Sequence, residues 1–152
     1  MGCTKGRWLS LLLAALGAVA ALSAVAAPSA PQVRGGELFA GTAALRGTIT
    51  GHASALPPAG ARCVNCHASG PAAAPASAAA SFGPLLTRQR LTEPLPRRGG
   101  PPSRYDEATF CRLLRTGIDP AYVLITRSMP RYELPDADCQ ALWLHLTEPM
   151  PP

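Results

Sequence analysis

The segment Cys63-Val64-Asn65-Cys66-His67 places two thiols and an imidazole within one short stretch of chain. C-x-x-C-H is the attachment motif of c-type haem. The thiols can add across the two haem vinyl groups, because two intervening residues let one turn of chain reach both groups. The histidine that follows directly then lies under the iron as the proximal ligand. We therefore predict one covalent haem c, attached through Cys63 and Cys66, with His67 as a metal ligand.

Two other uses of the motif compete with haem attachment. A redox-active C-x-x-C is expected in a thioredoxin-like β-α-β setting, which this sequence lacks. A zinc site could combine Cys63 and Cys66 with Cys111 and Cys139, but the second pair is not spaced as another C-x-x-C. Thiols outside the cytoplasm tend to oxidise, so the export signal described below also disfavours zinc.

A six-coordinate haem needs a second axial ligand, and four side chains are candidates: Met129, Met150, His52 and His145. Met129 lies in a proline-bounded loop, where Pro130 restricts the preceding backbone to extended geometry. Met150 lies among the terminal prolines, His52 in a glycine-rich loop and His145 on a predicted helix. The residues alone leave Met129 open as a ligand or as a methionine that fills a gap in the core.

The first segment of the chain has the organisation of an export signal. Lys5 and Arg7 precede an uncharged apolar run over residues 9–27 that ends in small residues. This order is typical of a cleaved secretory signal. We predict a signal peptide at 1–27 and an exported, periplasmic domain at 28–152. The alternative is a membrane anchor at residues 9–27, because about 20 apolar residues suffice to span a bilayer.

Composition limits what the exported part can be. The chain has 152 residues and five cysteines, and only 5% of the residues are aromatic. Removal of the signal takes Cys3 with it and leaves four cysteines and twelve arginines against nine acidic residues. This weak, scattered positive charge argues against a nucleic-acid partner, and we expect Arg97-Arg98 to be a solvated loop. A core so poor in aromatics is thin and needs a staple, a metal or a cofactor.

Helix signals appear at three places. A short helix is expected at residues 36–42, after a small-residue leader at 28–36. A second helix begins near Ser103, with Asp106 in a capping-box position, and ends at Gly117. A last helix opens at Asp136 and presents apolar side chains at helical spacing.

The remaining segments are expected to be irregular. Residues 46–62 and 94–102 are rich in proline and glycine, and residues 69–81 are a low-complexity Pro/Ala/Ser stretch. No segment alternates convincingly as a strand. We therefore predict an all-α domain with long loops.

Taken together, these motifs resemble a small class I-type monohaem cytochrome c over roughly residues 34–148. The resemblance is carried by the haem motif and by Gly36-Glu37-Leu38-Phe39, Phe82-Gly83-Pro84-Leu85, Arg115-Thr116-Gly117-Ile118-Asp119, Met129-Pro130 and the segment from Asp136 to Leu146. It implies a cytochrome c-like fold in which the first and last helices cross, with Phe39 near Trp143 or Leu142. The links over 42–62 and 69–102 are longer than the family pattern.

The resemblance also implies roles for particular residues. Met129 would be the second axial ligand, and a proline carbonyl would orient the proximal histidine through its other ring nitrogen. Pro84 is the best match for that proline, and Pro71 is the alternative. Cys111 and Cys139 would lie on neighbouring helices, where a disulfide is compatible with export; the alternative is two buried thiols.

The implied function is one-electron transfer. With both axial positions filled, such a haem has no open site for a substrate, so the protein would be a carrier or an electron-accepting subunit rather than an enzyme. Its partners would be redox proteins such as a dehydrogenase, an oxidase or another respiratory complex. The alternative is a haem enzyme or gas-binding sensor with an open or labile sixth site. A membrane contact is expected only if the signal segment stays attached.

Overall fold

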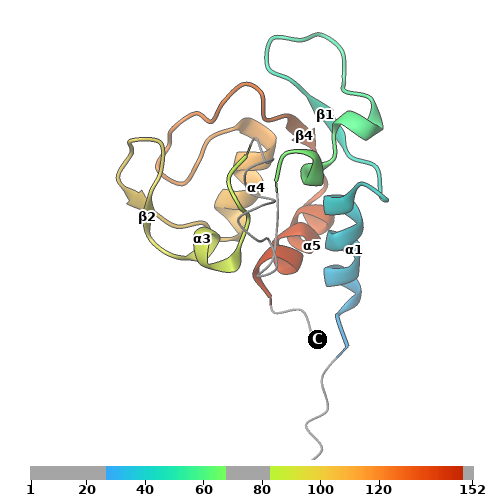
Figure 1. The fold of residues 1–152 in the computed structure, drawn as a ribbon, viewed down its shortest axis with the longest axis horizontal. Coiled ribbons are helices and arrows are strands. Elements are labelled where there is room, and N and C mark those ends of the chain that lie inside the picture. Colours follow the sequence, from blue (N-terminus) through green and yellow to red (C-terminus); the bar gives the residue numbers. More distant parts are fainter. Residues whose placement is uncertain (1–26, 68–82, 149–152) are drawn as a thin grey trace, which may run out of the picture.

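Two helices from opposite ends of the chain pack side by side in the computed structural model, which describes residues 27–67 and 83–148 (Figure 1). They are α1 (Ala30–Ala40) and α5 (Asp136–Thr147). The helices approach closely at Gly35, where a β-carbon would overlap the backbone of Ala141. Arg34 adds an ion pair to Asp138 at 2.9 Å. The predicted packing of the first helix against the last is therefore observed.

The aromatic contacts of this helix pair differ from the expectation. The ring of Phe39 lies against the ring of His145, with 5.8 Å between centroids. Trp143 instead contacts Phe110, at 5.5 Å. Phe39 and Leu142 belong to the same buried cluster, against which Trp143 also packs.

The helices begin and end where capping groups satisfy the backbone. α1 begins at Ala30 rather than at residue 36, because Ser29 and Gln32 form a reciprocal capping box. Helix α4 (Glu107–Thr116) is capped by Asp106 with Thr109, while Ser103 lies in a strand. Gly117 ends α4 in the left-handed conformation, as predicted.

Two small antiparallel sheets accompany the helices, so the prediction of an all-α fold is wrong and the domain is a mixed α/β structure. β1 (Arg46–Thr48) pairs with β4 (Arg131–Glu133), and β2 (Leu95–Pro96) pairs with β3 (Pro102–Ser103). None of these strands exceeds three residues. Alternation over such lengths cannot be recognised in a sequence. Three lie in segments expected to be irregular, and β3 reaches Ser103, the expected helix cap.

The remaining elements are short. They are the 3₁₀ turns η1 (Pro58–Gly60) and η2 (Cys63–Asn65) and the helix α3 (Arg88–Thr92). Among the described residues, no helix combines the length and apolar character needed to cross a bilayer. The predicted signal and the low-complexity stretch at 69–81 lie outside the described residues, apart from residue 27.

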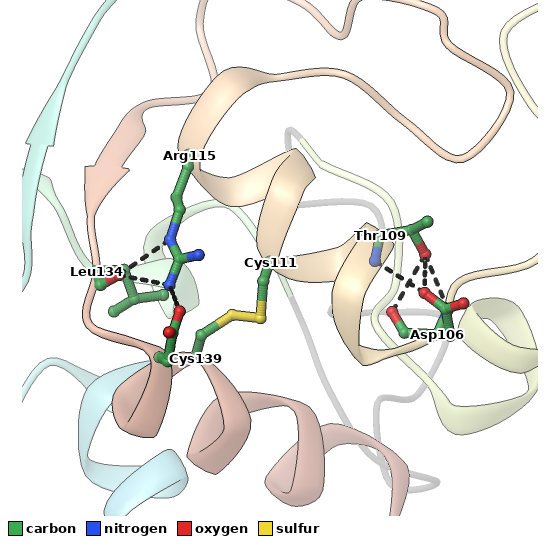
Figure 2. Close-up of a disulfide and its surroundings, with 7 residues drawn as sticks. Asp106, Thr109, Cys111, Arg115, Leu134 and Cys139 are labelled. Atoms are coloured by element: carbon green, nitrogen blue, oxygen red, sulfur yellow. Dashed lines mark hydrogen bonds and ion pairs between the residues drawn. A yellow bond between two sulfur atoms is a disulfide. The ribbon is translucent and has the colours of Figure 1, made fainter.

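A disulfide joins α4 to α5 (Figure 2). It links Cys111 and Cys139, whose Cα atoms are 5.8 Å apart, and both residues are buried. Arg115 reinforces the same junction by donating to the carbonyl oxygen of Leu134 at 2.8 Å and by pairing with Asp136 (Figure 2). The staple expected for a thin core is therefore present in the structure.

Removing this disulfide tests its contribution to stability. We expect Cys111→Ala combined with Cys139→Ala to lower the free energy of unfolding by about 3 kcal/mol, because the unfolded chain loses a constraint across a separation of 28 residues. Urea denaturation of the oxidised wild type, the reduced wild type and the double variant measures the effect. A wild type whose midpoint is the same with and without reductant would contradict the prediction.

His145 makes the α1–α5 contact dependent on pH. Burial lowers the pKa of His145, so the unfolded chain takes up a proton at a higher pH than the folded chain does. Stability should therefore fall as the pH drops below about 6.5, the usual histidine pKa. Chemical denaturation at several pH values between about 7.5 and 5, which span the usual histidine pKa, measures this change in the free energy of unfolding. His145→Gln should flatten the dependence, whereas His52→Gln, at an exposed turn, should retain it.

Candidate functional site

The helices and loops enclose a cavity of about 890 Å³. Its wall is mostly apolar, and the side chains come from every part of the described chain. They include Phe39, Leu56, Leu91, Leu95, Phe110, Leu113, Leu114, Ile125, Leu142 and Leu146. Cofactor pockets typically enclose roughly 300–1,000 Å³ and are lined in this way by apolar and aromatic groups.

The C-x-x-C-H motif forms a tight turn on the wall of this cavity. Cys63–Asn65 is a 3₁₀ turn, and the N–H groups of Cys66 and His67 both donate to the carbonyl oxygen of Cys63, at 3.1 and 2.9 Å. Asn65 fixes the outside of the turn through a 2.7 Å hydrogen bond to the carbonyl oxygen of Ala59. Cys63, Cys66 and His67 therefore line the same cavity, as the motif predicts.

His67 is oriented by a backbone carbonyl. Its side chain is buried, and Nδ1 lies 2.8 Å from the carbonyl oxygen of Pro84. A carbonyl oxygen only accepts hydrogen bonds, so Nδ1 must carry the proton. In the neutral ring the lone pair then lies on Nε2, which is one of the two ring nitrogens through which histidines bind metals. Pro84 thus makes the contact predicted for it, and Pro71 lies outside the described residues.

Gly83 allows this contact to form. Its N–H donates to the carbonyl oxygen of Cys66 at 2.8 Å, which brings residues 83–84 against the motif. A β-carbon at Gly83 would overlap the ring of His67. In the sequence, Gly83 was noted only as part of the motif over residues 82–85. A glycine directly before the proline that orients His67 is the signal that could have predicted the close approach of the backbone to the imidazole ring.

Met129 also lines the cavity, whereas His52 and His145 do not. It is half-buried, and its loop is held by Arg131, which donates to the carbonyl oxygen of Met129 at 2.7 Å. His145 lies between α1 and α5 against Phe39, and His52 is exposed. Met150 lies outside the described residues. The structure therefore brings the thioether of Met129 to the cavity that His67 also lines.

The protonation of Cys63 argues against redox chemistry of the C-x-x-C. Burial raises the pKa of the Cys63 thiol to about 11. Catalytic and redox-active cysteines have a lowered pKa, because the thiolate is the reactive form. Tyr132, buried beside Cys63, donates to the carbonyl oxygen of Ala61 at 3.1 Å, and burial raises its pKa. Tyr132 was not singled out from the sequence.

Positive charge gathers on one part of the cavity wall. Arg62, Arg90, Arg97 and Arg98 all line it. Arg97 is fixed by a 3.2 Å hydrogen bond to the carbonyl oxygen of Ser103 and lies over the ring of Tyr105, at 4.8 Å from the centroid. The expectation of a solvated loop is therefore wrong for Arg97, whereas Arg98 is exposed in a turn as expected. This part of the wall suits the anionic groups of an otherwise apolar ligand.

The zinc alternative finds no support among the described residues. Cys111 and Cys139 are bonded to each other and are not available as partners for Cys63 and Cys66. No group of three or more His, Cys, Asp or Glu side chains in residues 27–67 and 83–148 is arranged to hold a metal ion.

Comparison with family models, with curated proteins and with solved structures finds no match to this chain.

The tautomer of the His67 imidazole can be tested directly. Gly83→Ala should push the imidazole away from Pro84, reduce the Nδ1–H tautomer and lower the thermal midpoint, because the added β-carbon overlaps the ring. Long-range ¹H–¹⁵N spectra of the histidine ring measure the tautomer. Gly60→Ala is the matched control, since the β-carbon there meets its nearest side chain at an ordinary 3.6 Å. An unchanged His67 tautomer in Gly83→Ala would contradict the assignment.

Proposed function

We propose that this chain is an exported, periplasmic one-electron transfer protein that carries one covalent haem c. The observation that carries the proposal is the meeting of Cys63, Cys66, His67 and Met129 on the wall of one apolar cavity. In this reading His67 and Met129 are the axial ligands, and the thiols of Cys63 and Cys66 become thioethers to the porphyrin.

The residues present fit such a group. The volume and apolar lining of the cavity suit a large aromatic macrocycle, and the arginines on its wall suit the carboxylates at the edge of a haem. The hydrogen bond from Nδ1 to Pro84 leaves Nε2 as the nitrogen with a lone pair. When bound, a haem supplies reversible one-electron chemistry at its iron.

The side chains of this chain then set the properties of the centre. Pro84 holds the Nδ1 proton and so keeps His67 in one tautomer and one orientation. Met129 offers a neutral, soft sulfur, which favours the reduced metal and raises the potential relative to a second histidine. The apolar side chains of α4 and α5 line the cavity and would keep water from the cofactor, which His67 and Met129 would hold. Electron transfer to redox proteins is the function that these properties serve.

Expression in a host with c-type haem maturation tests the proposal. We expect purified protein to contain one covalent haem by the pyridine haemochrome assay, and the oxidised protein to show a methionine–iron charge-transfer band. Cys63→Ala with Cys66→Ala should abolish covalent haem, since each thiol forms one bond to the porphyrin. Met129→Ala should abolish the charge-transfer band and open the iron to carbon monoxide. Met150→Leu, at the rival methionine, should leave the spectrum unchanged.

Two outcomes would contradict the proposal. A protein without covalent haem under these conditions rejects the cofactor. A wild-type ferrous form that is high-spin and readily binds carbon monoxide rejects His67/Met129 ligation and favours a haem enzyme or gas-binding sensor.

A further inference from the structure

The loop that leads into the cavity wall displays the two most exposed large apolar side chains of the described residues. They are Tyr122 and Leu124, with 77% and 69% of their surface exposed. The same loop continues through Ile125 to Met129, which both line the cavity. Exposed apolar side chains beside a functional cavity indicate a place where another molecule docks.

Hydrogen bonds fix this loop in one conformation. Ile118 and Leu124 form an antiparallel bridge that closes it. The buried Asp119 accepts from the N–H of Val123 through Oδ1 at 2.8 Å, and its own N–H donates to the carbonyl oxygen of Val123 at 3.0 Å. A surface ordered in this way loses little conformational freedom when a partner binds.

Tyr122 occupies a backbone conformation that favours glycine. Its φ is +62°, a left-handed value that costs free energy for a residue with a β-carbon. Its ring is held by Arg112, whose guanidinium lies 4.4 Å from the ring centroid and donates to the carbonyl oxygen of Asp119 at 2.9 Å. The chain therefore keeps Tyr122 in a strained backbone conformation in which its aromatic ring is exposed.

The segment of the chain that contains the loop is rich in arginine. Residues 83–131 contain nine arginines and four acidic residues, whereas residues 132–148 contain four acidic residues and no lysine or arginine. The turn that carries Arg98 lies against the loop, since a β-carbon at Gly100 would meet Val123 at 3.2 Å. Arg127 follows the loop directly, and both arginines are exposed.

We propose that Tyr122, Leu124, Arg98 and Arg127 form a docking surface for an acidic redox protein. The redox nature of the partner rests on the proposed function, and its acidic character rests on the exposed side chains of Arg98 and Arg127. A protein fits better than a lipid bilayer, because the surface adjoins the wall that contains Met129, where an electron would leave the molecule.

An NMR titration maps the surface without requiring electron transfer. The probe is an oxidised plant-type [2Fe–2S] ferredoxin, chosen for its strongly acidic surface, added to the ¹⁵N-labelled chain at low salt. We expect the perturbed signals to lie at residues 97–100 and 118–127, and the affinity to fall as salt is added. Perturbations centred on α1 or spread evenly over the molecule would overturn the proposal.

Paired variants separate the apolar and charged parts of the surface. Tyr122→Gly with Leu124→Ser should weaken binding roughly tenfold. Glycine at position 122 relieves the backbone strain, so the thermal midpoint should not fall and a loss of binding is not a loss of folding. Arg98→Gln with Arg127→Gln should weaken binding and flatten its salt dependence. Val33→Ser with Arg46→Gln, at exposed positions on α1 and β1, should bind as the wild type does.

Three further outcomes also test the proposed docking surface. Equal binding by all variants would overturn the proposal. Sedimentation of the protein with phosphatidylglycerol vesicles at physiological salt, lost in Tyr122→Gly with Leu124→Ser, would overturn it in favour of a membrane surface. A chain that lacks covalent haem but binds with the expected footprint would support the docking surface and reject the proposed electron-transfer function.

Discussion

The hydrogen bond between Nδ1 of His67 and the carbonyl oxygen of Pro84 sets the chemistry that the site can perform. A neutral imidazole has one proton, and placing it on Nδ1 determines where the metal-binding lone pair lies. The bond joins two segments that flank residues 68–82, so it forms only where the chain returns to the C-x-x-C-H turn. The N–H of Gly83 makes that return through Cys66, and the absence of a side chain at Gly83 leaves room for the ring.

The walls around this histidine are held together by a close helix approach and a disulfide. Large aromatic side chains usually supply much of the burial in a core, and this chain has few of them. Instead, Gly35 lets α1 approach the backbone of α5, and the Cys111–Cys139 disulfide ties α5 to α4. α1, α4 and α5 each contribute side chains to the cavity. The close helix approach and the disulfide therefore hold together three elements of the cavity wall.

Local chemistry could be predicted from the sequence, whereas long-range pairing could not. The role of Gly117 and the helix opened by Asp136 depend on residues close together in the chain, and the structure places them as expected. The β1–β4 sheet joins residues such as Gly47 and Tyr132, which no local pattern connects. The start of α1 was missed because the reciprocal bonds of Ser29 and Gln32 lie in a segment whose small residues indicated a leader.

The long insert over 42–62 has a structural role that its composition did not reveal. Its strand β1 pairs with β4, which begins two residues after Met129. Gly47 lies opposite Tyr132, and a β-carbon there would meet Pro130 and the ring of Tyr132 at 3.1 Å. The insert therefore packs against the segment that carries Met129 and buries the tyrosine beside Cys63. The insert thus connects two parts of the cavity wall. Its strand β1 pairs with β4, next to Met129, and the chain after β1 leads into the C-x-x-C-H turn.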